Sequence, residues 1–492
     1  MATLGSMSRT ELPPEIWRHI LSFLSEPYEL LPNCGVNRLF YDVAVDYRYR
    51  NLRMGFPSNS AVFKLRRARD PWLAKRVKSL YISTDAIELL FKEWPSFLLP
   101  SRPRWWNAIL SLLPDAVLKT VTVPEPKPPS EKKDECTNVD AEEISNLILD
   151  AADGMTNIEK LEFHSTPTSE LDFELEFLRL LCSRLQHLQM LTFWVATDMV
   201  HLVLPVLQFC NLKKITLHIH ACGAGGAAPS ADACPRIRQF LRYFAPTLES
   251  LTVSTFDREV IEQMSSALHD DAVMPRLQKL SIFLMINDIQ AFQSINANYP
   301  VLTELALTTC TPTTIVSLAY LQLPELRSLT LWFRHMNTTQ GLWNGSSSFT
   351  KLETLHLMNG CELCPDEVAQ LCRFFKKANI LDLMLCVYIL DGDLIDTLAL
   401  SFPSLSTLIL TAQHVGRVDI IPTPDVDLAS FEMEMQDRSY PEWNLSWVNV
   451  ALPVSDWNNY TARMEAARMV TSIVTRCIPS MNKRGGDEEE LL

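Results

Sequence analysis

One short pattern, Leu-x-x-Leu-x-Leu, recurs ten times along this chain of 492 residues, with other apolar residues accepted at the leucine positions. First positions of successive copies lie 30, 24, 36, 29, 25, 24, 26, 28 and 25 residues apart. A unit of about 25 residues cannot bury its apolar face without a stacked neighbour, so a period of this size is typical of a solenoid. The ten copies are Ile158/Leu161/Phe163, Leu188/Leu191/Phe193, Leu212/Ile215/Leu217, Leu248/Leu251/Val253, Leu277/Leu280/Ile282, Leu302/Leu305/Leu307, Leu326/Leu329/Leu331, Leu352/Leu355/Leu357, Ile380/Leu383/Leu385 and Leu405/Leu408/Leu410.

Each copy predicts one strand, because its last two apolar positions are two residues apart and point to the same face. The residues between copies are expected to turn, return as a helix and turn again. Two such helices are legible, one opening at Pro365 and one over 236–245, both with apolar residues three or four apart. Weaker copies extend the series at Val77/Leu80/Ile82, Leu118/Val121/Val123 and Leu428/Phe431/Met433.

This repeat resembles the leucine-rich repeat. The resemblance implies an α/β fold, a curved horseshoe with parallel strands inside and helices outside. The asparagine or cysteine usual in that family, three residues after the last leucine, is present as Cys310. Other units have different residues there, among them Thr166, His220 and Arg334. We therefore expect the polar ladder of regular leucine-rich arrays to be mostly absent.

The N-terminal residues 10–50 form a second informative stretch, with the pattern of three short helices. Pro13 and Pro14 suit a first helical turn, where a missing N–H costs nothing. A second helix is expected from Pro27 and a third from Val36. Such a small unit buries little apolar surface and needs a partner or a neighbouring domain. The apolar residues of the first helix are Ile16, Ile20, Phe23 and Leu24.

This stretch resembles an F-box, the motif that docks substrate-recognition subunits onto the Skp adaptor of cullin–RING ubiquitin ligases. The resemblance is carried by Leu12-Pro13-x-Glu15-Ile16, Ile20-Leu21-Ser22-Phe23-Leu24 and Val36-Asn37-Arg38-x-Phe40, and it departs at Pro32, Gly35 and Asn37. It implies that the adaptor contacts Leu12, Pro13, Ile16, Ile20, Leu21 and Leu24. The alternative is that these residues cap the solenoid by packing against Val62, Phe63 and Leu65.

The expected domain order follows from these two features. Residues 1–9 are expected to be disordered, 10–50 to be the F-box, 51–76 a linker or N-terminal cap, and 77–435 the solenoid. Residues 124–143 are charged and proline-rich, so they predict a disordered insertion. Residues 436–480 would cap the last repeat and 481–492 form a disordered acidic tail. Trp443, Trp447 and Trp457 would cover that repeat, although ligand contact is an alternative role for them.

Composition favours an intracellular binding protein. No apolar run approaches the about 18 residues of a membrane span, and the first residues lack a secretory signal. The 12 cysteines follow no disulfide spacing, which suits the cytoplasm or nucleus. A net charge of −14 argues against a nucleic-acid partner. The basic residues Arg66, Arg67, Arg69, Lys75, Arg76 and Lys78 form one candidate patch, which the more ordinary interpretation places on a solvated junction.

Catalytic signatures are weak. Gly223-x-Gly225-x-x-Ala228 imitates a dinucleotide fingerprint, but it follows the third of ten units in one register and is explained better as an insertion. Cys361-x-x-Cys364 lacks the second pair of a tetrahedral metal site. His218 and His220 share one strand face without a third ligand at a suitable spacing. We therefore expect no cofactor, no metal and no catalytic residues.

Function is then expected on the strand face away from the helices. Trp194, Phe283, Trp332 and Met358 follow the last apolar position of their units and are unusually large for a solvent-facing sheet, so they are candidate substrate anchors. They could instead turn inward at the strand ends. The combined interpretation is a non-catalytic substrate adaptor of an SCF-type ligase, monomeric within a complex of a Skp-type adaptor, a cullin and an unknown protein substrate. A leucine-rich scaffold or inhibitor acting without a cullin is the alternative, and an NAD-dependent enzyme a third.

Overall fold

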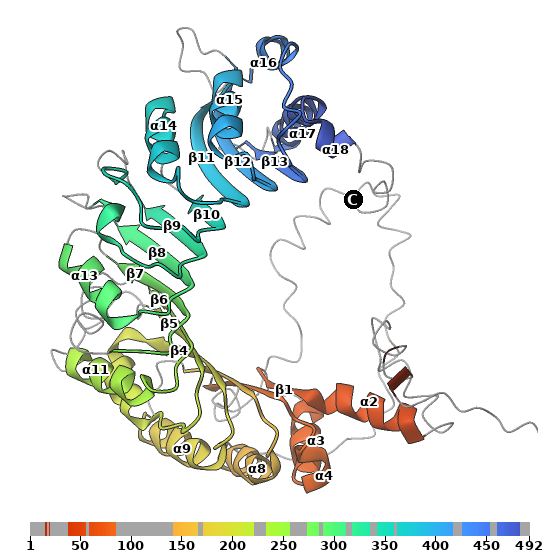
Figure 1. Ribbon diagram of the computed structural model, residues 1–492. Coiled ribbons are helices and arrows are strands. Elements are labelled where there is room, and N and C mark those ends of the chain that lie inside the picture. The colour runs from red at the N-terminus through yellow and green to blue at the C-terminus, as the bar shows by residue number, and fades with distance from the viewer. Residues whose placement is uncertain are drawn as a thin grey trace, which may run out of the picture. The chain divides into compact units, whose positions relative to one another are not determined.

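The computed structural model describes residues 15–16, 19, 38–55, 59–84, 141–165, 171–220, 233–255, 273–284, 289–310, 317–334, 342–358, 362–416, 426–452 and 460–482. The chain divides into two compact units, Met1–Phe193 with Val206–Asn211, and Trp194–Pro205 with Leu212–Leu492. Each unit is built from parallel strands that alternate with helices along the chain (Figure 1). The fold class is therefore α/β, as the repeat pattern predicts.

The first unit contains strands that pair in chain order. Strand β1 pairs with β2 and β2 pairs with β3, both in parallel. Helices α3, α4 and α9 pack against α8. The elements are α2 (Arg38–Arg50), β1 (Asn51–Met54), α3 (Asn59–Ala68), α4 (Pro71–Ala74), β2 (Ser79–Ser83), α8 (Ala141–Gly154), β3 (Lys160–His164) and α9 (Leu171–Arg184). The division between the units falls inside strand β4 (Met190–Ala196), after Phe193, and inside the short helix η3 (Leu204–Val206), after Pro205.

The second unit continues the same alternation. Its strands pair in parallel from β5 to β13 in chain order, and the helices α11, α13, α14 and α15 all lie on one side of them (Figure 1). We call the opposite side of these strands the open face. The strands are β5 (Lys214–His220), β6 (Ser250–Thr255), β7 (Lys279–Leu284), β8 (Glu304–Cys310), β9 (Ser328–Arg334), β10 (Thr354–Met358), β11 (Asp382–Leu390), β12 (Thr407–Val415) and β13 (Trp447–Ala451).

Helices connect most of these strands. They are η2 (Thr197–Met199), α10 (Val200–Val203), α11 (Ala233–Phe244), α13 (Ile289–Asn298), η4 (Leu318–Tyr320), α14 (Pro365–Phe374), α15 (Gly392–Ser401), α16 (Leu428–Met435), α17 (Tyr460–Arg476) and α18 (Pro479–Asn482). None of the helices in the described ranges combines the length and apolarity needed to cross a bilayer.

Burial follows the repeat pattern. Along β3, β6 and β10, and along β12 as far as Ala412, every second residue is buried, and the residues between them are only partly covered. Leu305, Leu329 and Leu355 are all nearly inaccessible to solvent and adjacent in register. The two last apolar positions of each copy therefore point toward the helices, and the residue between them points to the open face.

Backbone hydrogen bonds stack one repeat on the next just before each strand. The carbonyl of Glu249 accepts from the amides of both Gln278 (2.8 Å) and Lys279 (3.1 Å), and that of Gln278 accepts from Thr303 and Glu304 in the following unit. This two-amide arrangement supplies lateral hydrogen bonds without a side-chain ladder. It recurs at the carbonyls of Lys78, Glu159, Lys213, Thr303, Arg327, Glu353, Leu381 and Ser406.

The predicted strands and helices are confirmed in most places. The last two positions of all ten copies lie on strands, β3 to β12, and Leu80 and Ile82 of the weaker copy lie on β2. The helix expected to open at Pro365 is α14, where the Glu367 carboxylate accepts from the amide of Cys364. The helix expected over 236–245 is α11, and the third N-terminal helix is α2.

Other expectations were wrong or incomplete. The weaker copy at Leu428/Phe431/Met433 is wrong, since these residues belong to helix α16. Strands β1 and β13 arise in ranges where no strand was expected. Helix α8 begins at Ala141, inside the range expected to be a disordered insertion. The copy at Leu118, the glycine segment 223–228 and Cys361 lie outside the described residues.

Candidate partner-binding face

Residues between the buried strand positions form rows across the open face. The register joins Thr252 to Ser281, Ser281 to Ala306 and Ala306 to Thr330. A second row lies two residues earlier in each strand and consists of Ser250, Lys279, Glu304 and Ser328. Six of these eight side chains are serine, threonine or alanine, so this part of the face carries short side chains.

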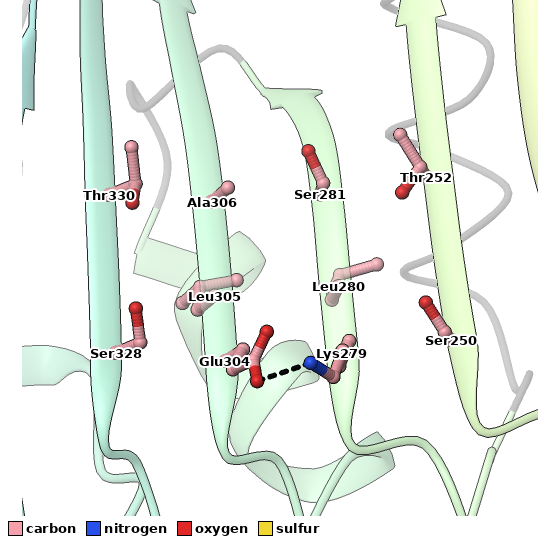
Figure 2. Close-up of a pocket in the computed structure, with 10 residues that line it drawn as sticks. All are labelled: Ser250, Thr252, Lys279, Leu280, Ser281, Glu304, Leu305, Ala306, Ser328 and Thr330. Carbon is pink, nitrogen blue, oxygen red and sulfur yellow. Dashed lines mark ion pairs between the residues drawn. The ribbon is translucent and has the colours of Figure 1, made fainter. Parts of the chain in front are cut away.

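These short side chains leave a shallow hollow over β6 to β9 of about 170 Å³ (Figure 2). Pockets for small-molecule ligands usually enclose about 300–1,000 Å³. The hollow is therefore too small for such a ligand, and its size matches one or two inserted side chains of a partner. Lys279 and Glu304 form an ion pair beside it, so the two charges that line the hollow neutralise each other.

Two of the predicted anchors lie next to this hollow and next to each other. Trp332 on β9 is the register partner of Met358 on β10, and its other neighbour is Thr308 on β8. Trp332 and Met358 are both half-buried. They thus stand on the open face rather than inside the core, where they would be covered completely.

The other two predicted anchors do not join this pair. Trp194 is half-buried and stacks on His218 of β5, with ring centroids 3.9 Å apart and planes 22° apart. The backbone of Phe283 lies on β7 in register with Thr308, and its side chain is outside the described part of the structure. The structure therefore assembles Trp332 with Met358 and places Trp194 separately with His218.

Beyond Thr330 the middle row of the open face carries larger side chains. In the middle row, Thr330 is followed by His356, Met384 and Ile409, all half-buried. His356 Nε2 lies 3.2 Å from a carboxylate oxygen of Asp382 on the next strand. Neither the hollow nor this histidine–aspartate pair was among the predicted site residues, although short residues at the middle position of four successive copies were a usable signal.

Strand β3 of the first unit carries a separate ion-pair cluster. Glu162 on β3 lies 3.2 Å from Lys160 Nζ and 3.4 Å from His164 Nε2. Partial burial of the Glu162 carboxyl opposes ionisation, but Lys160 and then His164 outweigh it and hold its pKa below the usual value. Across the described residues, no group of three or more His, Cys, Asp or Glu side chains is arranged to hold a metal ion.

Most of the predicted adaptor-binding residues cannot be placed. Ile16 belongs to a helical stretch with Glu15, and its side chain is 45% exposed. Leu12, Pro13, Ile20, Leu21 and Leu24 lie outside the described residues. Of the residues that would receive them in the capping alternative, Val62 and Leu65 are buried and Phe63 is exposed.

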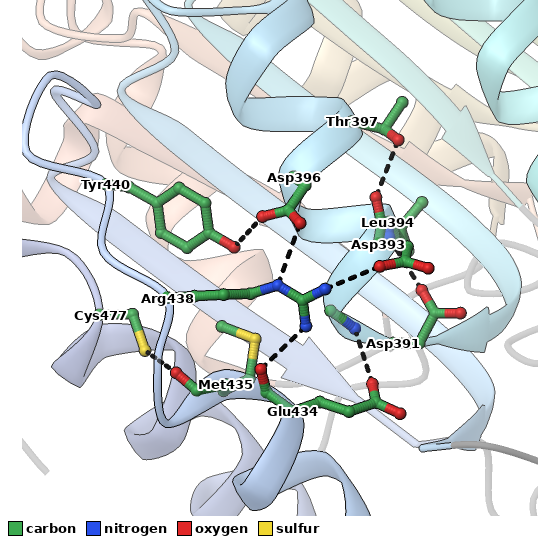
Figure 3. A network of polar contacts seen from close by, with 11 residues as sticks. Asp391, Asp393, Leu394, Asp396, Thr397, Glu434, Met435, Arg438, Tyr440 and Cys477 are labelled. Atoms are coloured by element: carbon green, nitrogen blue, oxygen red, sulfur yellow. Dashed lines mark hydrogen bonds and ion pairs between the residues drawn. The ribbon is translucent and has the colours of Figure 1, made fainter.

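A polar network that the sequence did not predict lies near the C-terminal end of the second unit (Figure 3). Arg438 donates to Asp396 (3.0 Å), to Asp393 (2.7 Å) and to the carbonyl of Glu434 (2.9 Å). The hydroxyl of Tyr440 donates to the other oxygen of Asp396 at 2.6 Å. Burial first, and then Asp396, raises the pKa of Tyr440. This network joins α15 to α16 and the segment after it, so its role is structural.

Comparisons with known proteins add little to this geometry. No family model matches the chain, and no curated protein matches it. Among solved structures, it is similar to a chain in the crystal structure of the Rad7 and Elc1 complex in yeast, with 14% identity and a TM-score of 0.36. The similarity covers 62% of this chain and 75% of that chain. A likeness of this size carries no argument about function.

Proposed function

We propose that this chain is the substrate-recognition subunit of an SCF-type cullin–RING ubiquitin ligase. The observation that carries the proposal is a sequence order, in which an F-box-like segment around Leu12-Pro13-x-Glu15-Ile16 precedes a long parallel-strand repeat. The repeat supports the second half of this order, since its strands occur where the pattern predicts them. The exposed side chain of Ile16 is compatible with a contact to an adaptor.

In this proposal the chain catalyses nothing itself. Its N-terminal segment binds a Skp-type adaptor and through it a cullin, while the open face binds a protein substrate. Holding both partners on one chain raises the effective concentration of the ubiquitin-carrying enzyme near the lysines of the substrate. Transfer of ubiquitin is then faster, although this chain contributes no catalytic group. The proposed compartment is the cytoplasm or the nucleus.

The open face suits a protein ligand for two physical reasons. Its hollow is too small for a drug-sized molecule, and Trp332 with Met358 provides a polarizable, half-exposed pair of the kind that anchors protein partners. We propose that one apolar side chain of the substrate contacts Trp332 and Met358 while a neighbouring one enters the hollow.

Co-purification with the Skp adaptor tests the adaptor half of the proposal. The full chain should retain the adaptor, and the double substitution Ile16→Asp with Leu24→Asp should abolish retention. The matched control is Leu400→Asp with Met433→Asp, which introduces the same charges at two exposed apolar positions, 84% and 69% exposed, on α15 and α16. The control should bind the adaptor like the unmodified chain.

Failure of a well-folded chain to bind the adaptor would refute the ligase proposal. It would leave the second candidate, a leucine-rich scaffold or inhibitor that works without a cullin. That candidate keeps the open face as its binding surface, so Trp332→Ala and Met358→Ala should reduce partner capture under either function.

A further inference from the structure

Positive charge is concentrated in one short part of the chain. Between Arg38 and Ser83 the sequence has eleven lysines and arginines against three aspartates and no glutamate, although the whole chain carries −14. Solubility does not explain a strongly basic segment in an acidic protein, because evenly distributed charges would keep the protein equally soluble. The structure gathers part of this charge around one pocket.

The pocket lies in the first unit, between the end of α2 and the segment that follows α4. It is open, encloses about 540 Å³ and is lined by four cationic side chains, together with Asp46, Trp72 and Asn157. The four cations are Arg50, Lys75, Arg76 and Lys78. Its volume is about three times that of the hollow on the open face and lies within the usual range for ligand pockets.

Two of the four cations already have carboxylate partners. Arg76 contacts Asp42 at 3.2 Å and also pairs with Asp46, and Lys78 Nζ lies 2.6 Å from Glu159. Arg50 and Lys75 are exposed and have no ion-pair partner within the described residues. Arg50 and Lys75 are therefore the unpaired cations of the pocket, although the four cations together face three carboxylates, those of Asp42, Asp46 and Glu159.

The cationic side chains are attached to a rigid frame. The amide of Lys78 donates to the carbonyl of Arg50 at 2.9 Å, and Asn157 Nδ2 donates to the carbonyl of Lys75 at 2.8 Å. The guanidinium of Arg76 lies over the ring of Trp72, 3.9 Å from its centroid. Because the backbone that carries these cations is fixed in advance, binding of an anion has to order only the side chains and not the main chain.

Trp72 adds an aromatic surface at the edge of the pocket. Its side chain is 45% exposed, and Tyr41, also exposed, stacks on it with ring centroids 6.4 Å apart. Single exposed aromatics are ordinary, but a stacked pair beside uncompensated cations offers a ligand both charge and an apolar contact. A bare inorganic ion would use only the charge.

We propose that this pocket binds a phosphorylated side chain of a protein partner. A phosphate monoester carries about −1.5 to −2 charge at neutral pH, which matches the charge left on Arg50 and Lys75. The guanidinium of Arg50 binds phosphate oxygens in a bidentate manner, and Lys75 adds a point charge. Residues that flank the phosphorylated one in the partner pack on Trp72 and Tyr41.

The geometry favours this ligand over a nucleic acid. A polynucleotide needs a basic stripe that neutralises several successive phosphates, and the net charge of the chain repels a long polyanion. Here the pocket offers two unpaired cations rather than a continuous stripe, and Asp46 lies within the same lining. The site is separate from both proposed ligase contacts, since it lies at the C-terminal end of the F-box-like segment and uses neither the adaptor-binding residues between Leu12 and Leu24 nor the open face.

Fluorescence anisotropy on the full chain tests the proposal. The probe is a fluorescein-labelled peptide pool, Ala-x-x-phosphoserine-x-x-Ala, compared with its unphosphorylated form and with a labelled single-stranded DNA 8-mer. The phosphorylated pool should bind at least ten times more tightly than the unphosphorylated pool. Arg50→Gln with Lys75→Gln should remove that preference. The control, Arg66→Gln with Arg67→Gln, makes the same change of charge at exposed positions of α3 outside the pocket and should keep it.

Each other outcome overturns the proposal. Equal losses in the two double variants would assign the effect to overall charge, and equal binding of both peptide pools would remove the phosphate from recognition. Tighter binding of the DNA 8-mer with a steep salt dependence would identify a nucleic-acid surface. Thermal stabilisation of the chain by inorganic phosphate, without any peptide binding, would assign the pocket to the free anion. Circular dichroism of both variants checks that a loss does not come from unfolding.

Discussion

Replacing Gly392 by alanine should destabilise the second unit through one identifiable side chain. Gly392 is the first residue of α15, and a Cβ atom at this position would overlap Nη1 and Cζ of Arg438. The guanidinium can move because it ends a flexible side chain, but it cannot move without leaving its partners. The cost of the substitution is therefore the cost of dismantling the Arg438 network (Figure 3).

The magnitude follows from the exposure of each partner. Asp393 is 82% exposed, so its ion pair contributes roughly 0–0.5 kcal/mol. The bond to partly exposed Asp396 contributes about 1–1.5 kcal/mol after allowance for solvent screening, and the bond to the carbonyl of Glu434 about 1 kcal/mol. Alanine in a helix recovers about 0.5 kcal/mol over glycine. The expected net loss of unfolding free energy is about 1.5–2.5 kcal/mol.

A double-mutant cycle separates this mechanism from general intolerance at Gly392. Arg438→Ala alone should cost about 2–3 kcal/mol, because it removes the same contacts. Once Arg438 has been shortened, Gly392→Ala should cost nothing or stabilise by about 0.5 kcal/mol. The two substitutions should therefore show a coupling energy of about 2–3 kcal/mol. The assay is urea unfolding followed by circular dichroism, with hydrogen exchange of α15 and α16 as a local readout.

Gly345→Ala is the matched control. Gly345 has a φ of +93°, so alanine is strained there whether or not Arg438 is present. Its cost should be equal in the two backgrounds. If Gly392→Ala were equally costly in both backgrounds as well, with a coupling energy below about 0.5 kcal/mol, the overlap with Arg438 would not be the cause and the reasoning would be refuted.

Three further outcomes are expected. Trp443→Phe should lower the unfolding free energy by about 1–2 kcal/mol in urea, because Trp443 Nε1 donates to the buried carbonyl of Phe402 at 3.1 Å; an unchanged midpoint would contradict this. Burial raises the pKa of the Cys182 thiol to about 12. Iodoacetamide at pH 8 should therefore label the exposed Cys210 well before Cys182 in the native chain, as followed by mass spectrometry. Equal labelling of the two cysteines would disprove the burial of Cys182. Ala306→Trp should fill the hollow and abolish partner capture while changing the unfolding free energy by no more than about 0.5 kcal/mol, whereas Ala306→Ser should preserve capture.

The strands were predictable because each is encoded locally. An apolar pair two residues apart, preceded by a third apolar residue, needs no distant partner to be recognised. The same signal was present but overlooked at Tyr49/Leu52/Met54 and Leu445/Val448/Val450, which form β1 and β13. Leu445 lies 40 residues after Leu405, beyond the spacing of the main series, and Tyr49 lies 28 residues before the weaker copy at Val77, outside the ten main copies. The period thus located the regular units and missed the ends.

The error at Leu428 has a physical cause. Leu428 and Phe431 are three residues apart, a spacing that suits both the repeat pattern and one face of a helix. Met433 completes the strand pattern, but it is 69% exposed, whereas Phe431 and Met435 are buried four residues apart. Helical periodicity therefore determines the structure of this segment. The residue that reveals it, Met435, lies just beyond the six residues of the repeat pattern.

The candidate sites were harder to foresee because they depend on register between repeats. Trp332 and Met358 could be singled out individually, yet only strand pairing makes them neighbours. The hollow consists of residues that are each unremarkable, and the Arg438 network joins residues more than 40 positions apart. Contacts of this kind are set by packing, which the local pattern does not encode.

The two proposed binding sites should differ in their response to salt. The charges that line the hollow, Lys279 and Glu304, neutralise each other, so a partner bound there gains little net electrostatic attraction. The other pocket has two unpaired cations, Arg50 and Lys75, and their attraction to a phosphate is screened as the Debye length falls. Between 50 and roughly 500 mM salt, phosphopeptide affinity should therefore fall at least about tenfold, while capture on the open face should change less than about twofold. A parallel decline at both sites would show that long-range charge, rather than Trp332, Met358 and the hollow, governs binding on the open face.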